Sequence, residues 1–174
     1  YRMGCAPCGK EENVLHIAEL TFTQENGNWR EKMKKAVFFD IDGTLWNEHM
    51  QVPESTTEAI RELRADGNYA FLCSGRSRSN IRSEKILGIV FDGIVAACGT
   101  HIEYEGKKVC ERLLTPEEAE ELLRVIEAYH MEAVLEGPHY IYANGEDFKE
   151  DPFIQYLRSE LGEDVREIRG QTEY

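Results

Sequence analysis

The 174-residue chain lacks any apolar run near the ~20 residues that a membrane-spanning helix requires. Its first residues also lack the apolar core of a secretory signal peptide. Basic residues are scarce, because 20 Lys and Arg stand against 33 Asp and Glu and leave a net charge of −13. Nucleic acids and anionic membranes are bound by basic surface, so we expect neither as an unaided partner. A cytoplasmic location is the default expectation.

Cysteine is sparse and shows no disulfide pattern. The five cysteines, an odd number, are scattered at positions 5, 8, 73, 98 and 110. They do not form the framework of a secreted disulfide-rich domain, so we expect reduced thiols. Cys5 and Cys8 have zinc-knuckle spacing, but only His16 lies near them and a structural zinc site needs four ligands. The other three fall on predicted strands, where packing is the expected role.

The two ends of the sequence also lack expected features. Tyr1 stands where an initiator methionine would, and the last residues, VREIRGQTEY, contain no helix cap or polar tail. We therefore expect part of a longer chain. Residues 1–33 differ from the rest of the chain, since apolar and polar residues alternate around Asn26-Gly27, which predicts a β hairpin. We interpret these residues as an N-terminal extension of unassigned function.

From Ala36 onward the sequence alternates between buried strands and helices. Continuous apolar runs predict strands over 36–39, 69–73 and 93–98. Between them, a helix is predicted from Pro53 to the Asp66-Gly67 stop, and another over 77–87. This spacing predicts an α/β fold with a doubly wound, Rossmann-like parallel sheet over residues 34–98.

After Gly99 the pattern becomes that of an α+β unit. A hairpin around Glu105-Gly106 is followed by a helix that opens with a capping box at Thr115. Two strands about Gly137-Pro138 and a helix over 151–161 complete the pattern. We place a boundary near Cys98 to Thr100, so that residues 99–174 form an inserted α+β domain.

The stretch AVFFDIDGTLW ends a buried strand in two aspartates. Ligands of parallel α/β sheets lie at the carboxyl ends of the strands, which is where Asp40 and Asp42 are expected. Residues i and i+2 of an extended segment point to the same side, so both carboxylates can approach one reacting centre. Such a pair can supply a nucleophile and a general acid, and its repulsion favours a divalent cation or a split in protonation. Gly43 permits a sharp turn beside a ligand, although a simple strand-ending Asp-Gly turn is the alternative.

FFDIDGTLW resembles the first motif of the haloacid dehalogenase-like (HAD) phosphatase superfamily, and Ser74 in FLCSGRS resembles its second motif. The stretch DGIVAACGTHIEYEGKKV looks like the Cof-like branch, which carries a type IIB α/β cap. The resemblance, which covers residue 34 to the C-terminus, implies that Asp40 is the nucleophile that forms an aspartyl-phosphate. Asp42 would be the general acid and base, and its backbone carbonyl would join the Asp40 carboxylate in holding Mg²⁺.

The same resemblance implies a phosphate-binding set. Ser74 and the Gly75 amide would hold the transferring phosphoryl oxygens, and Gly43 of the aspartate loop belongs to the same phosphate-binding set. Arg76 could reach a substrate phosphate as a bidentate donor, or it could pair with a surface acid. These roles suit phosphoryl transfer, in which positioning and charge neutralisation carry most of the catalysis.

The implied function is a magnesium-dependent phosphomonoesterase for a small phosphorylated metabolite, with a sugar phosphate favoured. A phosphomutase, a catalytically incomplete phosphate-binding fragment and a phospho-accepting signalling domain are the alternatives. The family's catalytic lysine and distal acidic motif are not found here, which leaves an incomplete core; the lysines after the core are Lys107, Lys108 and Lys149. Tyr140 and Tyr142 share a predicted strand face that suits stacking on a sugar or base. The sequence carries no signal for oligomeric state.

Overall fold

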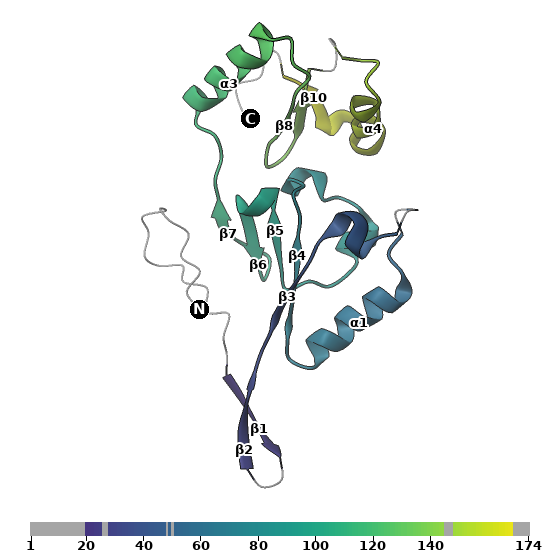
Figure 1. Ribbon diagram of the computed structural model, residues 1–174, viewed down its shortest axis with the longest axis vertical. Coiled ribbons are helices and arrows are strands. Elements are labelled where there is room, and N and C mark those ends of the chain that lie inside the picture. Colours follow the sequence, from purple (N-terminus) through teal and green to yellow (C-terminus); the bar gives the residue numbers. More distant parts are fainter. Residues whose placement is uncertain (1–19, 26–27, 48, 50, 145–147, 169–174) are drawn as a thin grey trace.

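The computed structural model describes residues 20–25, 28–47, 49, 51–144 and 148–168. The first element pair is an antiparallel hairpin of β1 (Leu20–Glu25) and β2 (Asn28–Met33), so the predicted N-terminal hairpin is confirmed (Figure 1). Its Asn26-Gly27 turn and the Cys5 and Cys8 pair lie outside the described residues. Within the described part of the chain, no helix is both long and apolar enough to cross a membrane.

A five-stranded sheet with the order β3-β4-β5-β6-β7 forms the core. Its strands are β3 (Ala36–Phe39), β4 (Tyr69–Cys73), β5 (Gly93–Ala96), β6 (His101–Tyr104) and β7 (Lys107–Glu111). The first three are parallel, as predicted, and β6 and β7 are added antiparallel to β5. The Rossmann-like α/β class is therefore confirmed for the part of the fold that is present. The 101–111 hairpin belongs to the core sheet, because β6 pairs with β5. The next sheet therefore begins after β7, and the boundary predicted near Cys98 falls within the core sheet.

Helix α1 (Glu54–Ala65) joins β3 to β4 and matches its prediction, with Pro53 preceding it and Asp66-Gly67 ending it. The helix predicted over 77–87 is wrong. Only α2 (Glu84–Leu87) is helical there, preceded by a single tight turn at Arg78–Asn80. The physical reason is that polar groups of residues 77–82 bind partners in a distant part of the chain.

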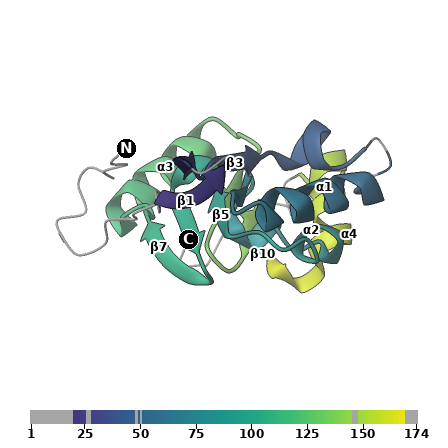
Figure 2. The same cartoon turned by 90° about the horizontal axis from the view of Figure 1, so that it is seen from below.

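The two helices cover one face of the core sheet (Figure 2). Their buried side chains Ile60 and Ile86 join one apolar cluster with Ala70, Leu72 and Ala96 of the strands. The opposite face carries a ladder of stacked rings, with Phe71 5.1 Å from Phe38 and 5.9 Å from Tyr104 between centroids.

Gly93 makes that ring ladder possible. A Cβ at this position would lie 2.6 Å from the Phe71 ring and 2.4 Å from the Glu103 carbonyl oxygen. Both distances are shorter than real Cβ contacts, so only glycine lets the Phe71 ring cross β5.

The third sheet has the order β10-β9-β8. It consists of β8 (Val134–Glu136), β9 (Ile141–Ala143) and β10 (Val165–Glu167), accompanied by α3 (Pro116–Ala128) and α4 (Pro152–Leu161). We call this sheet and its helices the second lobe. The capping box at Thr115 and the helix predicted over 151–161 are both confirmed. The lobe lies beyond the carboxyl ends of β3 and β4 (Figure 1).

An ion pair fastens α1 to the start of β5. Arg64 donates to both carboxylate oxygens of Asp92 at 3.0 and 2.7 Å, and the Ala70 amide donates to the same carboxylate at 2.8 Å. Burial raises the pKa of Asp92, but the Arg64 hydrogen bond and the Ala70 amide outweigh it and lower the pKa.

Replacing Asp92 by Asn should lower the free energy of unfolding at neutral pH by about 1–3 kcal/mol, because the bound donors lose a charged acceptor. Because the pKa of Asp92 is lower in the folded state, its ionised carboxylate stabilises the fold at pH values above the unfolded-state pKa of about 3.9. This stabilisation is lost as the pH falls through the folded-state pKa. Denaturant unfolding at pH 7 and near pH 3 should therefore show the parent and Asp92→Asn converging in acid. A difference that stays constant with pH would contradict this account.

Candidate active site

The aspartate loop begins at the carboxyl end of β3. Ile41 and Leu45, each 1% exposed, fix the loop to the core, and the Leu45 amide donates to the Asp40 carbonyl at 3.2 Å. Asp40 and Asp42 are both exposed. Gly43 has φ of 77°, a conformation that glycine adopts without strain. The buried positions thus hold a loop whose two carboxylates face outward.

Asp42 is bound by two side chains. The Arg76 guanidinium donates to both of its carboxylate oxygens at 2.8 and 2.7 Å, and the Trp46 indole donates to one of them at 3.3 Å. The guanidinium also lies over the Trp46 ring, 5.2 Å from its centroid. The Arg76 hydrogen bonds lower the pKa of Asp42 and outweigh the opposing effect of burial.

The ion pair of Arg76 with Asp42 is a third way to offset the repulsion between the Asp40 and Asp42 carboxylates. The sequence favoured a cation or a split in protonation, whereas the chain itself places a guanidinium on Asp42. Of the two interpretations of Arg76, pairing with an acid is the one that the structure has, and the acid belongs to the site. The partner is 34 positions away in sequence, which is why no local pattern identified it.

Removing the guanidinium should raise the pKa of Asp42. In Arg76→Met, a carboxyl carbon titration followed by NMR should give a higher midpoint for Asp42 than in the parent, because two charge-assisted hydrogen bonds to the ionised form are lost. Arg61→Met on the exposed side of α1 removes the same charge away from the site and should leave the midpoint unchanged. An unchanged midpoint in Arg76→Met would show that Arg76 does not control this carboxyl.

Ser74 and Gly75 follow β4, directly beside the aspartate loop. Phe39 pairs with Leu72, so Asp40 and Ser74 leave neighbouring strands at the same edge of the sheet. Ser74 is only 5% exposed, and its hydroxyl accepts from the Arg76 amide at 3.2 Å. Gly75 is exposed, so its backbone is open to a ligand.

Cys98 differs from its prediction. It lies in a tight turn after β5, with φ of 53°, and is exposed rather than packed in a strand. Its sulfur is 3.7 Å from where a Cβ of Gly75 would stand, so it borders the Ser74-Gly75 loop. The other described cysteines, Cys73 and Cys110, are half-buried on β4 and β7, as predicted.

The residues present fit a sparse magnesium site. Among the described residues there is no group of three or more His, Cys, Asp or Glu side chains that could hold a metal ion. Mg²⁺, however, is usually held by one or two carboxylates together with waters and substrate phosphates. The exposed Asp40 carboxylate and the Asp42 backbone carbonyl suit that mode.

Lys108, one of the three lysines that follow the core in the sequence, forms an ion pair with Glu111 on β7 at 2.5 Å.

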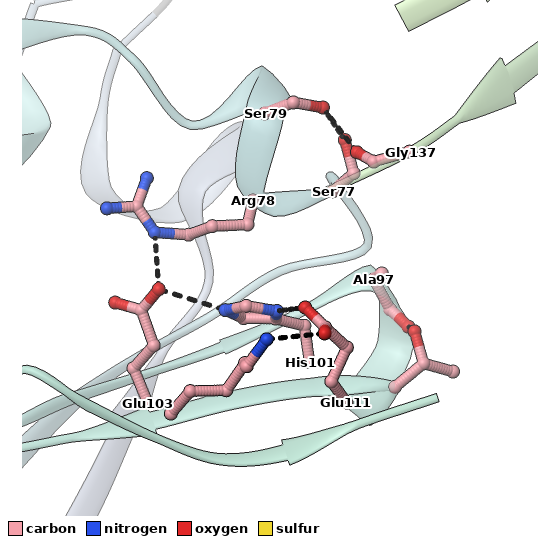
Figure 3. A network of polar contacts seen from close by, with 10 residues as sticks. Ser77, Arg78, Ser79, Ala97, His101, Glu103, Glu111 and Gly137 are labelled. Carbon is pink, nitrogen blue, oxygen red and sulfur yellow. Dashed lines mark hydrogen bonds and ion pairs between the residues drawn. The ribbon is translucent and has the colours of Figure 1, made fainter. Parts of the chain in front are cut away.

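A cavity of about 480 Å³ lies between the core hairpin and the second lobe. Its wall includes Arg78, His101 and Glu111. These residues belong to a polar network that sequence reasoning missed: His101 lies 2.9 Å from Glu103, behind the wall, and 3.3 Å from Glu111, and Arg78 donates to Glu103 at 2.9 Å (Figure 3). His101 and Glu103 share a strand face at i and i+2, which is the signal that could have found them. The apolar part of the wall includes Leu113, Leu114 and Leu135.

The two tyrosine rings that the sequence suggests for stacking on a sugar or base already have neighbours within the chain. Tyr140 and Tyr142 lie with their ring centroids 6.4 Å apart, as their shared strand face predicted. The Arg166 guanidinium already covers the Tyr140 ring at 3.3 Å from its centroid, and Tyr142 is 5% exposed. A sugar stacking on the covered face of Tyr140 would therefore have to displace Arg166, and the buried Tyr142 ring is not accessible.

Comparison with known proteins finds relatives for most of the chain. The Bacillus subtilis protein YkrA is 46% identical over 43 residues, which are 25% of this chain and 17% of YkrA. A solved protein of Geobacillus kaustophilus HTA426 is 28% identical with a TM-score of 0.61, covering 81% of this chain and 56% of that one. The subclass IIB sugar phosphatase BT4131 is 25% identical with a TM-score of 0.56, covering 72% and 49%.

This chain thus spans about half the length of the solved relatives that it matches. The family model of haloacid dehalogenase-like hydrolases matches residues 37–171, which include the aspartate loop, the Ser74 loop and the second lobe. The chain therefore belongs to the haloacid dehalogenase-like hydrolase family.

Proposed function

We propose that the protein is a magnesium-dependent phosphomonoesterase that acts on a small phosphorylated metabolite through an aspartyl-phosphate at Asp40. The observation that carries the proposal is the placement of exposed Asp40 and Asp42 beside the Ser74 and Gly75 loop, at the carboxyl edge of a parallel sheet. Family membership supports phosphohydrolase chemistry at this edge. The likeness to sugar phosphatase BT4131 favours a sugar phosphate as substrate.

Each residue has a role that its position supports. The Asp40 carboxylate attacks phosphorus and forms a mixed anhydride, while the leaving oxygen takes a proton from Asp42. Ser74 and the Gly75 amide hold the phosphoryl oxygens. The Asp40 carboxylate and the Asp42 backbone carbonyl would hold Mg²⁺, which when bound would supply the positive charge that a phosphate needs near two carboxylates. Water then hydrolyses the anhydride with Asp42 as the base.

The Arg76 pair adds a condition to this scheme. While Arg76 binds both oxygens of Asp42, the carboxylate is held ionised and cannot donate a proton. We therefore propose that substrate phosphate draws Arg76 away from Asp42, which frees the carboxyl for protonation. In this way the two interpretations of Arg76 describe two states of one residue.

We further propose that the second lobe is the substrate-screening cap. It lies over the carboxyl edge that carries the aspartates, and the cavity beneath it is within the size range of small-molecule sites. A phosphomutase would use the same residues but return the phosphoryl group to its substrate.

The deciding experiment is phosphate release from a panel of phosphomonoesters by the full chain, with Mg²⁺ and with chelator. Turnover that requires Mg²⁺ would support the proposal, and product analysis would separate a hydrolase from a mutase. A folded chain that binds inorganic phosphate with Mg²⁺ but gives no turnover would favour a phosphate-binding fragment, because the family lysine and distal acids are not found.

A further inference from the structure

The segment that follows the phosphate-binding loop is bound tightly to the second lobe. Glu136, at the end of β8, accepts from the Ser77 amide at 2.8 Å with one carboxylate oxygen. Its other oxygen accepts from the Asn80 side chain at 3.2 Å. One carboxylate of the second lobe therefore binds two donors of the core. We call residues 77–82 and the 136–139 turn the clasp.

Buried polar groups on both sides complete the clasp. Ser77 is 2% exposed and Ser79 is 4% exposed, with their hydroxyl oxygens 2.9 Å apart. The Ser79 hydroxyl donates to the Gly137 carbonyl at 2.8 Å (Figure 3). Hydroxyls that are buried and satisfied across an interface indicate a formed contact rather than a chance approach of two surfaces.

The Arg82 side chain binds the second lobe at the C-terminal end of residues 77–82. Arg82 donates to the His139 carbonyl at 2.8 Å and forms an ion pair with Asp164 of the second lobe. These contacts join positions 57 and 82 residues apart in sequence. They also explain why residues 77–82 are not the helix that their sequence predicted, since their polar groups are directed outward to the lobe.

The main chain between the clasp and the phosphate-binding loop has little freedom. The Ser74 amide donates to the Val95 carbonyl at 2.9 Å, and the Arg76 carbonyl accepts from the Ala97 amide at 2.8 Å. The next amide, that of Ser77, is the one that Glu136 binds. Glu136 thus binds the main chain three residues after Ser74, in a segment whose position is fixed by these hydrogen bonds.

From these contacts we propose that Glu136 is a positioning residue of the candidate active site. It fixes the second lobe over the phosphate-binding loop, and it couples phosphate binding at Ser74 and Gly75 to closure of the clasp. The coupling rests on the proposed function, whereas the clasp itself does not. Because coupling between two binding events is reciprocal, a phosphate that orders the loop must strengthen the clasp by the same factor.

Hydrogen exchange of the Ser77 amide in the full chain tests the clasp. In Glu136→Ala this amide should exchange about tenfold faster or more, because its acceptor is gone. Glu136→Gln keeps one acceptor oxygen and should give an intermediate rate, and Glu127→Ala on the exposed side of α3 should match the parent. Equal Ser77 exchange in all four proteins would overturn the clasp.

The affinity for inorganic phosphate with Mg²⁺ tests the coupling. Glu136→Ala should raise its Kd by about tenfold, with partial recovery in Glu136→Gln, and phosphate should slow Ser77 exchange in the parent. Equal Kd values in the parent and Glu136→Ala would overturn the coupling. If the parent binds no phosphate, the coupling and the proposed function both fail, while the exchange rates still decide whether the clasp exists.

Discussion

Asp40→Asn should lose phosphate release by a factor of at least about 10³, because an amide cannot form the phosphoryl anhydride. Asp40 is exposed directly after β3, so the change removes the proposed nucleophile without disturbing a buried group. The measurement is steady-state release of phosphate from the best substrate of the panel. Mass spectrometry after rapid quenching should find a phosphoryl adduct in the parent and none in Asp40→Asn.

Asp66→Asn is the matched control for this prediction. Asp66 ends α1 and leads into the start of β4, so it lies toward the end of the sheet opposite to the aspartate loop. The same chemical change there should leave turnover within about twofold of the parent, as for surface substitutions away from a site. Turnover by Asp40→Asn close to that of the control would assign the nucleophile to another residue.

The second large effect concerns stability rather than catalysis. Leu72→Ala should lower the free energy of unfolding by about 2–5 kcal/mol, since Leu72 is fully buried on the interior strand β4 and its removal leaves a cavity in the core. Domains have only about 5–15 kcal/mol in total, so a large share of the stability would be lost. Urea unfolding followed by circular dichroism would measure the loss.

Leu87→Ala provides the comparison for Leu72. Leu87 is 43% exposed at the end of α2, so the same truncation should cost less than about 1 kcal/mol. If the slope of the unfolding free energy against urea concentration is the same in the variants as in the parent, the substitutions have changed stability and not the surface exposed on unfolding. Equal losses in the two variants would mean that the cluster around Leu72 does not carry the core.

The elements that the sequence predicted well are those set by local pattern. β3 and β4 are short apolar runs that end in turn residues, and α1 has proline before its start and glycine after its end. The capping box at Thr115 is equally local, because its two partners are three positions apart. Asp40, Asp42 and Ser74 could be placed at one edge because parallel strands fix where their carboxyl ends meet.

The features that the sequence could not show depend on partners that are distant along the chain. Ser77 binds Glu136, 59 positions away, so a segment with helical apolar spacing instead extends across an interface. Arg76 had two plausible partners by sequence, and only the fold places Asp42 opposite its guanidinium. Cys98 ends an apolar run that predicts a strand, but β5 ends at Ala96 and Cys98 is exposed.

The position of β3 at the margin of its sheet also bears on how the protein behaves in concentrated solution. Within the described part of the chain β3 pairs with β4 alone, and Phe38 on this strand is 45% exposed. A strand with one free side can pair with the same strand of another molecule. The net charge of −13 opposes that approach at neutral pH. Near the sequence pI of about 4.9 the repulsion disappears, so self-association through β3 should be strongest there.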